Sequence, residues 1–245
     1  MRRLFLSITK GEELRFLGHL DFLRTMERAV MRSEIPVAFS EGFNPHMKLS
    51  LDSALGVGVT ADPLYLEMRL EGDMTLEEVK ERLSRQLPGG IIIHTVVEAE
   101  MNWPKFVAVF NEDAYEMEGP VTEGTDEEAF EKAKRNLEGF NSLSSFSYKR
   151  VTPKKIREMD VKPMILEPMR ASFEEERAYL TFSLVRSNMG TVQPKDIWKM
   201  LAESFHMPWT AGEFICSRTG TYRRINGKRL SLFDQGAFEG LLKGQ

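Results

Sequence analysis

The chain has 245 residues, of which 42% are hydrophobic and 29% charged, and its formal net charge is -4. This length suits one large domain or two small ones, and the charge balance excludes a globally basic nucleic-acid-binding protein while leaving local basic patches open. No run approaches the roughly 18 apolar residues of a membrane span and the N-terminus turns charged too early for a secretory signal, so we expect a soluble, cytoplasmic protein.

The first half predicts the order strand, helix, strands, helix, strand. Helices are expected at residues 19–32 and 75–87, and strands at 3–9, 37–40, 47–51, 65–70 and 91–97. Leu20, Leu23 and Met26 lie near helical spacing in the first helix, with Gly18 as its N-cap. Thr75 and Glu78 form a capping box that starts the second helix. This order is that of the split βαβ, or ferredoxin-like, fold.

The second half repeats this order. Helices are expected at residues 126–137 and 196–205, and strands at 107–116, 148–151, 179–185 and 214–218. A long basic segment separates the second and third of these strands. We therefore predict an α+β protein with two tandem ferredoxin-like halves. Residues 1–105 would carry the HLD and SEGFNPH motifs, and residues 106–245 would carry the basic loops.

The cysteine and histidine content limits cofactor chemistry. Cys216 is the only cysteine, which excludes an intramolecular disulfide, a Cys-based zinc site and an iron–sulfur cluster held by this chain alone. The four histidines are widely spaced and none forms an i, i+4 pair. We therefore predict no bound cofactor and no metal site.

The segment GHLDFLRTMERAVMR carries the first candidate site. Arg24 and Arg28 recur at helical spacing beside Asp21. Such residues suit either a solvated helix face with i, i+3 ion pairs or a row of guanidinium groups for phosphates. His19 opens the helix and has three possible roles, as a cap, as part of the core edge, or as an acid–base group.

The segment SEGFNPHMKLSL carries the second candidate site. Asn44 and Pro45 predict a sharp turn. In the strand that follows, His46, Lys48 and Ser50 share one face because the side-chain period is two. Packing explains the apolar residues on the opposite face. It does not explain why the polar residues share theirs, although a solvent-exposed face would accept them.

Two later segments combine basic residues with few acids. RVTPKKIREMDVKPMI contains Lys154, Lys155 and Arg157 in an expected loop. SRTGTYRRINGKR has an aromatic residue among basic ones, a combination that suits backbone contact plus base stacking. The residues of this second set are Arg218, Tyr222, Arg223 and Arg224. A solvated hairpin is the alternative for both segments. No serine-hydrolase elbow, Walker loop or HExxH motif is present.

The first half contains the segment LRFLGHLDFLRTMERAVMRSEIPVAFSEGFNPHMKLSL, followed by ALGVGV and YLEMRL. In these segments the chain resembles the radical-SAM-linked protein family. This is a bacterial domain of unknown function found beside, or fused to, radical S-adenosylmethionine proteins. Gly18 stands where the family usually has Ser, and Met47 where it usually has Pro. The resemblance implies a partner more than a reaction, and that partner would supply the iron–sulfur cluster. The tandem order is also similar to CRISPR repeat-processing endoribonucleases, in architecture only.

These observations favour a non-catalytic accessory protein that binds RNA, such as a tRNA, for a radical S-adenosylmethionine enzyme. The candidate ligand-binding residues are His19, Asp21, Arg24, Arg28, Ser40, Asn44, His46 and Lys48, and the candidate RNA-binding residues are Lys154, Lys155, Arg157, Arg218, Tyr222, Arg223 and Arg224.

Two alternatives remain open. One is a pure protein-interaction module whose motif residues contact the partner enzyme. The other is a metal-free endoribonuclease in which His19 and His46 act as general acid and base and Lys48 steadies the developing charge. A groove open to solvent would favour RNA, and a flat apolar patch near the motifs would favour a protein interface.

Overall fold

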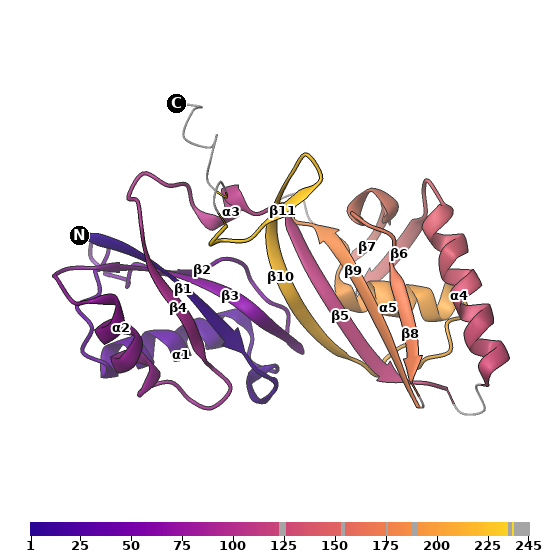
Figure 1. Ribbon diagram of the computed structural model, residues 1–245, viewed down its shortest axis with the longest axis horizontal. Helices are drawn as coiled ribbons and strands as arrows, with labels where there is room; N and C mark the ends of the chain where they lie inside the picture. Colours follow the sequence, from indigo (N-terminus) through magenta and orange to yellow (C-terminus); the bar gives the residue numbers. More distant parts are fainter. Residues whose placement is uncertain (123–125, 153–154, 175, 188–190, 235–236, 238–245) are drawn as a thin grey trace. The chain divides into compact units, whose positions relative to one another are not determined.

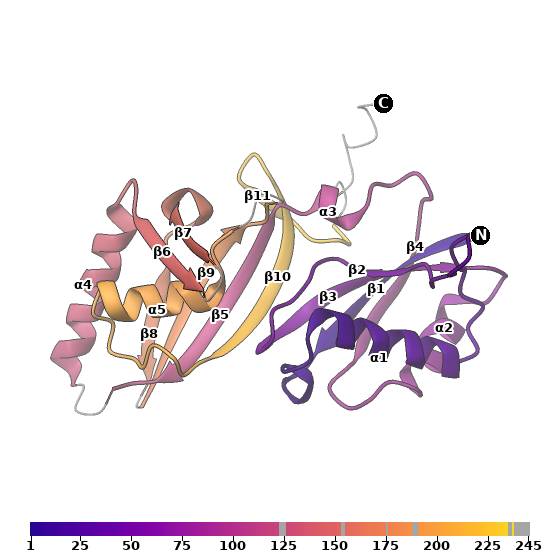
Figure 2. The same cartoon turned by 180° about the vertical axis from the view of Figure 1, so that it is seen from behind.

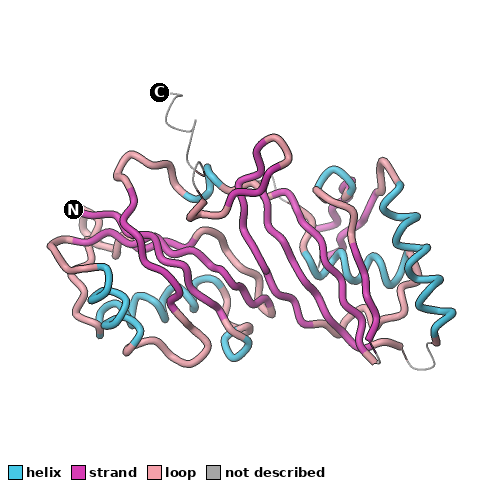
Figure 3. The backbone as a smooth tube through the Cα atoms, in the orientation of Figure 1, coloured by secondary structure: helices cyan, strands magenta, loops and turns pink. Residues whose placement is uncertain are grey.

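The computed structural model describes the chain except residues 123–125, 153–154, 175, 188–190, 235–236 and 238–245. It is a mixed α+β structure whose strands pair mostly in antiparallel fashion (Figures 1 and 3). The helices are α1 (His19–Arg32), α2 (Leu76–Ser84), α3 (Phe106–Val109), α4 (Glu127–Ser142) and α5 (Pro194–Ser204), with short 3-10 turns at Glu12–Leu14 and Lys162–Met164. None of these helices is long and apolar enough to cross a membrane.

The strands fall into two sets along the chain. The first set is β1 (Arg2–Lys10), β2 (Leu49–Leu51), β3 (Val59–Leu70) and β4 (Ile93–Ala99). The second is β5 (Glu112–Pro120), β6 (Ser147–Thr152), β7 (Lys155–Asp160), β8 (Arg170–Glu174), β9 (Arg177–Val185), β10 (Ile215–Ile225) and β11 (Lys228–Leu230).

The chain forms two compact units. The first contains Met1–Phe110 and Arg223–Gln245, and the second contains Asn111–Tyr222. The second unit therefore differs at both ends from the predicted half of residues 106–245. The reason is packing in the first unit, where Phe106 and Leu232 join Phe5 and Tyr65 in one apolar cluster.

The sheet of the first unit has β1 at its centre, between β4 and β3. β2 pairs with β3, and all these pairings are antiparallel. Leu4, Leu6 and Ile8 share one face of β1 and pack against buried residues of α1 and α2. The predicted helix at residues 19–32 is confirmed at both ends, as is the capping box that starts α2.

β1 is buried on its other face as well. The ring of Phe5 packs against that of Phe106 in α3, with the ring centroids 4.6 Å apart and the planes tilted by 41°. Arg3 lies on this face and is 1% exposed. Its Nε and Nη2 donate to the carboxylate of Glu67 at 2.9 and 2.7 Å. The same guanidinium also donates to the backbone carbonyls of Trp103 and Pro104. It thereby holds the chain leading into α3 against the sheet.

The second unit has the strand order β10, β5, β9, β8, again antiparallel. Helices α4 and α5 lie on one face of this sheet, as Figure 2 shows. Trp198 of α5 packs so closely on β5 that a Cβ on Gly119 would lie 2.7 Å from its ring, so glycine is required there. Strands β6 and β7 form a separate hairpin.

Three predicted elements differ from the structure. Residues 107–116 do not form one strand, because Phe106, Val109 and Phe110 recur at helical spacing and face one cluster, so α3 precedes β5. Residues 37–40 make only isolated bridges. Lys155 and Arg157 were expected in a loop but belong to β7, which pairs with β6.

The buried ion pair of Arg3 and Glu67 gives a stability prediction. Arg3→Met should lower the free energy of unfolding by about 3 kcal/mol, because it leaves a buried carboxylate without its main partner. The double variant Arg3→Met, Glu67→Met should recover much of that loss, since no uncompensated charge remains. Urea unfolding of the three proteins measures both effects, and a double variant no more stable than the single one would contradict the explanation.

Candidate functional site

One end of the first unit is built around the start of α1. Gly18, the N-cap, has an extended backbone and no side-chain cap bond. A Cβ at Gly18 would lie 3.9 Å from Cγ2 of Val57. The backbone N–H of Gly58 donates to the carbonyl of Arg15 at 2.8 Å. The chain before α1 and the chain before β3 are therefore joined at this end.

Large apolar side chains are exposed around this junction. Phe16 is 68% exposed, Leu20 64% and Val57 67%. We call these three residues the apolar end. The guanidinium of Arg15 lies 4.7 Å above the ring of Phe16. Single exposed apolar residues are ordinary, but a group of them at one helix terminus forms the kind of patch that marks an interaction surface.

A buried lysine fixes the geometry of the apolar end. Lys10, the last residue of β1, is 1% exposed. Its ammonium donates to the carbonyls of Arg15, Leu17 and Val59 at 3.4, 2.9 and 3.1 Å. Burial lowers the pKa of this ammonium, and the three carbonyls offset part of the cost of burying a charge. Lys10 thus ties β1 to both segments that carry the apolar end.

His19 is the first residue of α1 and is half-buried. Its Nδ1 is buried and has no hydrogen-bond partner within the described part of the chain. Buried ring nitrogens usually have a partner. His19 therefore sits beside the apolar end with one ring nitrogen unused.

The arginines of α1 continue the exposed side of the helix that begins at Leu20, at i, i+4 spacing. Asp21 Oδ1 is 3.6 Å from Arg24 Nη1, and both side chains are exposed. Arg32 donates to the carbonyl of Gln86, just beyond the end of α2. Arg28 is one turn before Arg32 and is exposed, so the row lies on the solvent-exposed side of α1. The pairing of Asp21 with Arg24 fits the solvated-face alternative.

The SEGFNPH segment forms a closed loop, which we call the motif loop (residues 40–46). The backbone N–H of Ser40 donates to the carbonyl of His46 at 2.8 Å, and the N–H of His46 donates to Ser40 Oγ at 2.9 Å. Gly42 has φ of +119°, a conformation that favours glycine. Phe43, Asn44 and His46 are all exposed, and Phe43 projects fully into solvent with a relative exposure of 105%.

The two candidate histidines are held at different places. The base of the motif loop is tied to Arg69, whose N–H donates to the carbonyl of Lys48. Gly18, next to His19, lies against Val57, just before β3 begins. β3 covers roughly 30 Å between Val59 and Arg69. Among the described residues no hydrogen bond joins His19 to His46, and the geometry does not bring them together as an acid–base pair.

Three of the seven predicted RNA-binding residues in the second half make contacts within the fold. Arg218 is completely buried, with Nη1 3.7 Å from Asp113 Oδ1, so we remove it from the residues proposed to contact RNA. Arg223 is half-buried and donates to the carbonyl of Ala237, and burial lowers its pKa. Arg224 donates to the carbonyl of Gly227 in its own hairpin at 3.4 Å.

The remaining members of that set differ in exposure. Arg157 is exposed on β7, and Tyr222 is half-buried on β10. Lys155 lies on β7, and Lys154 lies outside the described residues. Within the described ranges, no group of three or more His, Cys, Asp or Glu side chains is placed to hold a metal ion.

Comparison with known proteins places the chain in a family. Residues 3–194 match the profile of a family described as "Uncharacterized protein conserved in bacteria (DUF2344)". The chain belongs to this family. No curated protein matches the chain. Among solved structures, an unknown protein from Galdieria sulphuraria is 12% identical over 76% of this chain and 82% of its own, with a TM-score of 0.26. A TM-score this low carries no argument about the fold.

Several residues of this family member escaped sequence reasoning. Phe16, Leu20 and Val57 look like core residues in the sequence because each fits an apolar pattern. Phe43 looked like part of a turn. Lys10 looked like a surface residue in a polar turn. The one available signal is that Phe43 has no apolar neighbour at strand spacing, where Glu41 and Pro45 stand.

Lys10 generates a pH prediction. In the folded chain the pKa of Lys10 lies below its ordinary value of 10.5. At pH values approaching 10.5 the unfolded chain therefore binds more protons at this residue than the folded chain does. This contribution to the free energy of unfolding should therefore rise with pH in that window. Lys10→Met should remove the rise. Near neutral pH it should also cost about 1–3 kcal/mol, because buried carbonyls lose their donor.

Urea unfolding of the wild-type protein and Lys10→Met across alkaline pH tests this prediction. Lys80→Met is the control, since Lys80 is exposed and its ammonium donates to the carbonyl of His94. Parallel pH profiles for the wild type and Lys10→Met would refute it.

Proposed function

We propose that this protein is a non-catalytic accessory subunit that docks on a partner protein through the apolar end. The observation that carries the proposal is the exposure of Phe16, Leu20 and Val57 around the N-cap of α1. Aromatic and aliphatic side chains at the centre of an interface provide most of its binding energy. Arg15, His19 and Asp21 border these residues in sequence and would form the polar rim that such interfaces have.

The rigidity of the apolar end supports the same proposal. The ammonium of Lys10 and the bond from Gly58 to Arg15 fix the two segments that carry it. A surface that is already ordered loses little conformational entropy when a partner binds. Exposed apolar residues on a fixed frame therefore fit docking better than they fit a loosely packed core edge.

The family resemblance supports a radical S-adenosylmethionine enzyme as the partner. Cys216 is the only cysteine of the chain and is buried, so the chain by itself does not supply the several thiolates that an iron–sulfur cluster needs. The iron–sulfur cluster would then belong to the partner. Under this proposal the protein acts beside that enzyme, in the cytoplasm.

We also propose that the two units are tandem ferredoxin-like halves. Strand orders β4, β1, β3, β2 in the first unit and β10, β5, β9, β8 in the second support it. Among the four strands of each unit's sheet, one helix follows the first strand and another follows the third, which is the order of a split βαβ unit. Fold alone implies no activity.

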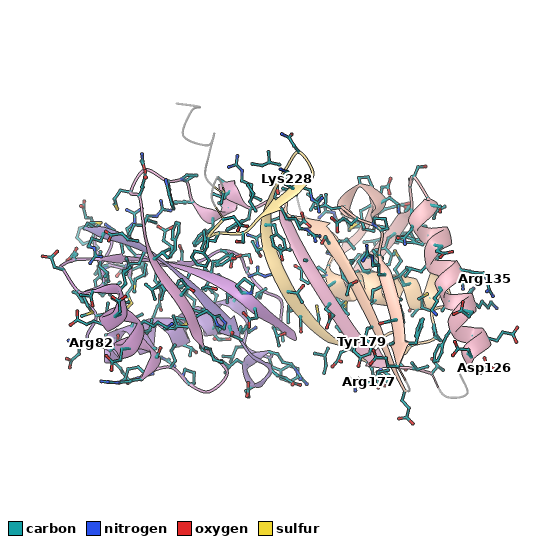
Figure 4. All side chains as sticks on the ribbon, in the orientation of Figure 1. Arg82, Asp126, Arg135, Arg177, Tyr179 and Lys228 are labelled. Atoms are coloured by element: carbon teal, nitrogen blue, oxygen red, sulfur yellow. The ribbon has the colours of Figure 1, made fainter. Side chains whose placement is uncertain are left out.

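RNA binding is the second candidate function. It is favoured by the hairpin of β10 and β11, in which Asn226 and Gly227 form a two-residue turn with positive φ. Lys228 and Arg229 follow the turn and are exposed, and Figure 4 shows Lys228 at the tip of the hairpin. A basic tip of this kind suits contact with a phosphate backbone. The metal-free endoribonuclease alternative has no such support, because His19 and His46 are held apart.

Docking through the apolar end predicts a specific loss of partner binding. Leu20→Asp and Val57→Asp should each weaken binding to the radical S-adenosylmethionine enzyme by about 10-fold or more, because each puts a charge into the buried centre of the interface. Isothermal titration of the two purified proteins measures the effect. Met31→Asp is the matched control, since Met31 is 67% exposed on the same helix near its other end. Equal affinities for Leu20→Asp and Met31→Asp would rule out docking at the apolar end.

RNA binding through the hairpin predicts a change in salt dependence. Replacing Lys228 and Arg229 together by Gln should lower the slope of log affinity against log salt by about 2, because two phosphate contacts are lost. Filter retention of total small RNA across a salt series measures the slope. Lys149→Gln is the control, at a side chain 67% exposed in the second unit. A slope unchanged by the double substitution would remove the hairpin from the RNA-binding surface.

A further inference from the structure

We infer that the motif loop is a nucleotide-binding site. The ring of Phe43 stacks on a base of single-stranded RNA, and Lys48 with Arg69 holds a neighbouring phosphate. This deepens the RNA-binding candidate above and rests on it. It is independent of docking through the apolar end.

Presentation of the ring is the first argument. Phe43 makes no packing contact that would explain its presence, since it is fully exposed. The loop that carries it is closed by two hydrogen bonds between Ser40 and His46, above a bridge between Phe39 and Met47. The ring is therefore held out by an ordered loop, with its faces open. Base stacking uses an aromatic face of this kind and accepts any base.

The neighbours of the ring distinguish a base from a protein pocket. Glu41, Asn44 and His46 flank Phe43, and all are exposed. Their side chains make no hydrogen bond or ion pair with the described residues. An anchor that enters a protein pocket is usually surrounded by contacts that exclude water, as the apolar end provides. An amide and an imidazole instead offer donors and acceptors for the edge of a stacked base.

The charges at the base of the loop complete the argument. Lys48 directly precedes β2, and the backbone N–H of Arg69 donates to its carbonyl at 3.0 Å, next to the β2–β3 pair of Leu49 and Met68. The nearby carboxylate of Glu67 is 3.7 Å from Arg69 but already accepts two bonds from Arg3. The Glu67 carboxylate is therefore already shared by two guanidinium groups, and a phosphate would supply a negative charge for Lys48 and Arg69.

The test uses the full chain and fluorescently labelled single-stranded oligomers of adenosine and of uridine. Phe43→Ala should weaken binding by about 10-fold, whereas Phe43→Trp should retain binding, and its emission should be quenched when the adenosine oligomer is added. Of the three native tryptophans, Trp198 and Trp209 are buried and Trp103 is half-buried. Wild-type protein titrated with the same oligomer therefore gives the background, and the additional quenching reports the new residue. Lys48→Gln and Arg69→Gln should each lower the salt slope by about 1.

Ile156→Ala is the control for loss of an exposed apolar side chain, since Ile156 is 68% exposed on β7, and it should bind as the wild type does. If wild-type protein binds neither oligomer, the RNA-binding candidate and the motif-loop site both fail. If it binds and Phe43→Ala binds equally well, only the motif-loop site fails. If Phe43→Ala leaves RNA binding intact but releases the partner enzyme, Phe43 is a protein anchor and the nucleotide site is overturned.

Discussion

Burial of β1 on both faces is the constraint on which the first unit depends. A strand covered on two sides has no solvent for its polar groups, yet β1 carries Arg3 near its start and Lys10 at its end, and both are almost completely buried. Each buried cation donates hydrogen bonds to backbone carbonyls of another segment, and these bonds offset part of the cost of removing it from water. Arg3 thereby holds the chain before α3, and Lys10 holds the chain before α1 and the start of β3.

The two candidate surfaces of the first unit differ in chemistry and in place. The apolar end consists of aliphatic and aromatic side chains on a frame fixed by Lys10. The motif loop presents one aromatic ring among hydrogen-bonding side chains, above Lys48 and Arg69. Because they are tied to opposite ends of β3, one protein could hold a partner enzyme at one surface and a nucleotide at the other.

Basic segments in the sequence proved a poor guide to basic surfaces. Arg150 pairs with the carboxylate of Asp196, and Lys162 donates to the carbonyls of Phe140 and Asn141. Arg218 is buried near Asp113. A guanidinium or ammonium group can be exposed to solvent or can donate to buried acceptors, and the sequence pattern does not distinguish these two environments. The decision depends on which strands and helix ends come together in the fold.

The sequence by itself determined the local elements whose causes are local. These are the helix from His19 to Arg32 with Gly18 before it, the capping box of Thr75 and Glu78, and the tight turn at Asn226 and Gly227. Only the tertiary structure decided which apolar residues are core. Phe106 is buried against Phe5, whereas Phe43 and Phe16 are exposed. The physical reason is that burial depends on contacts between residues far apart in the chain, and no spacing within a short segment records them.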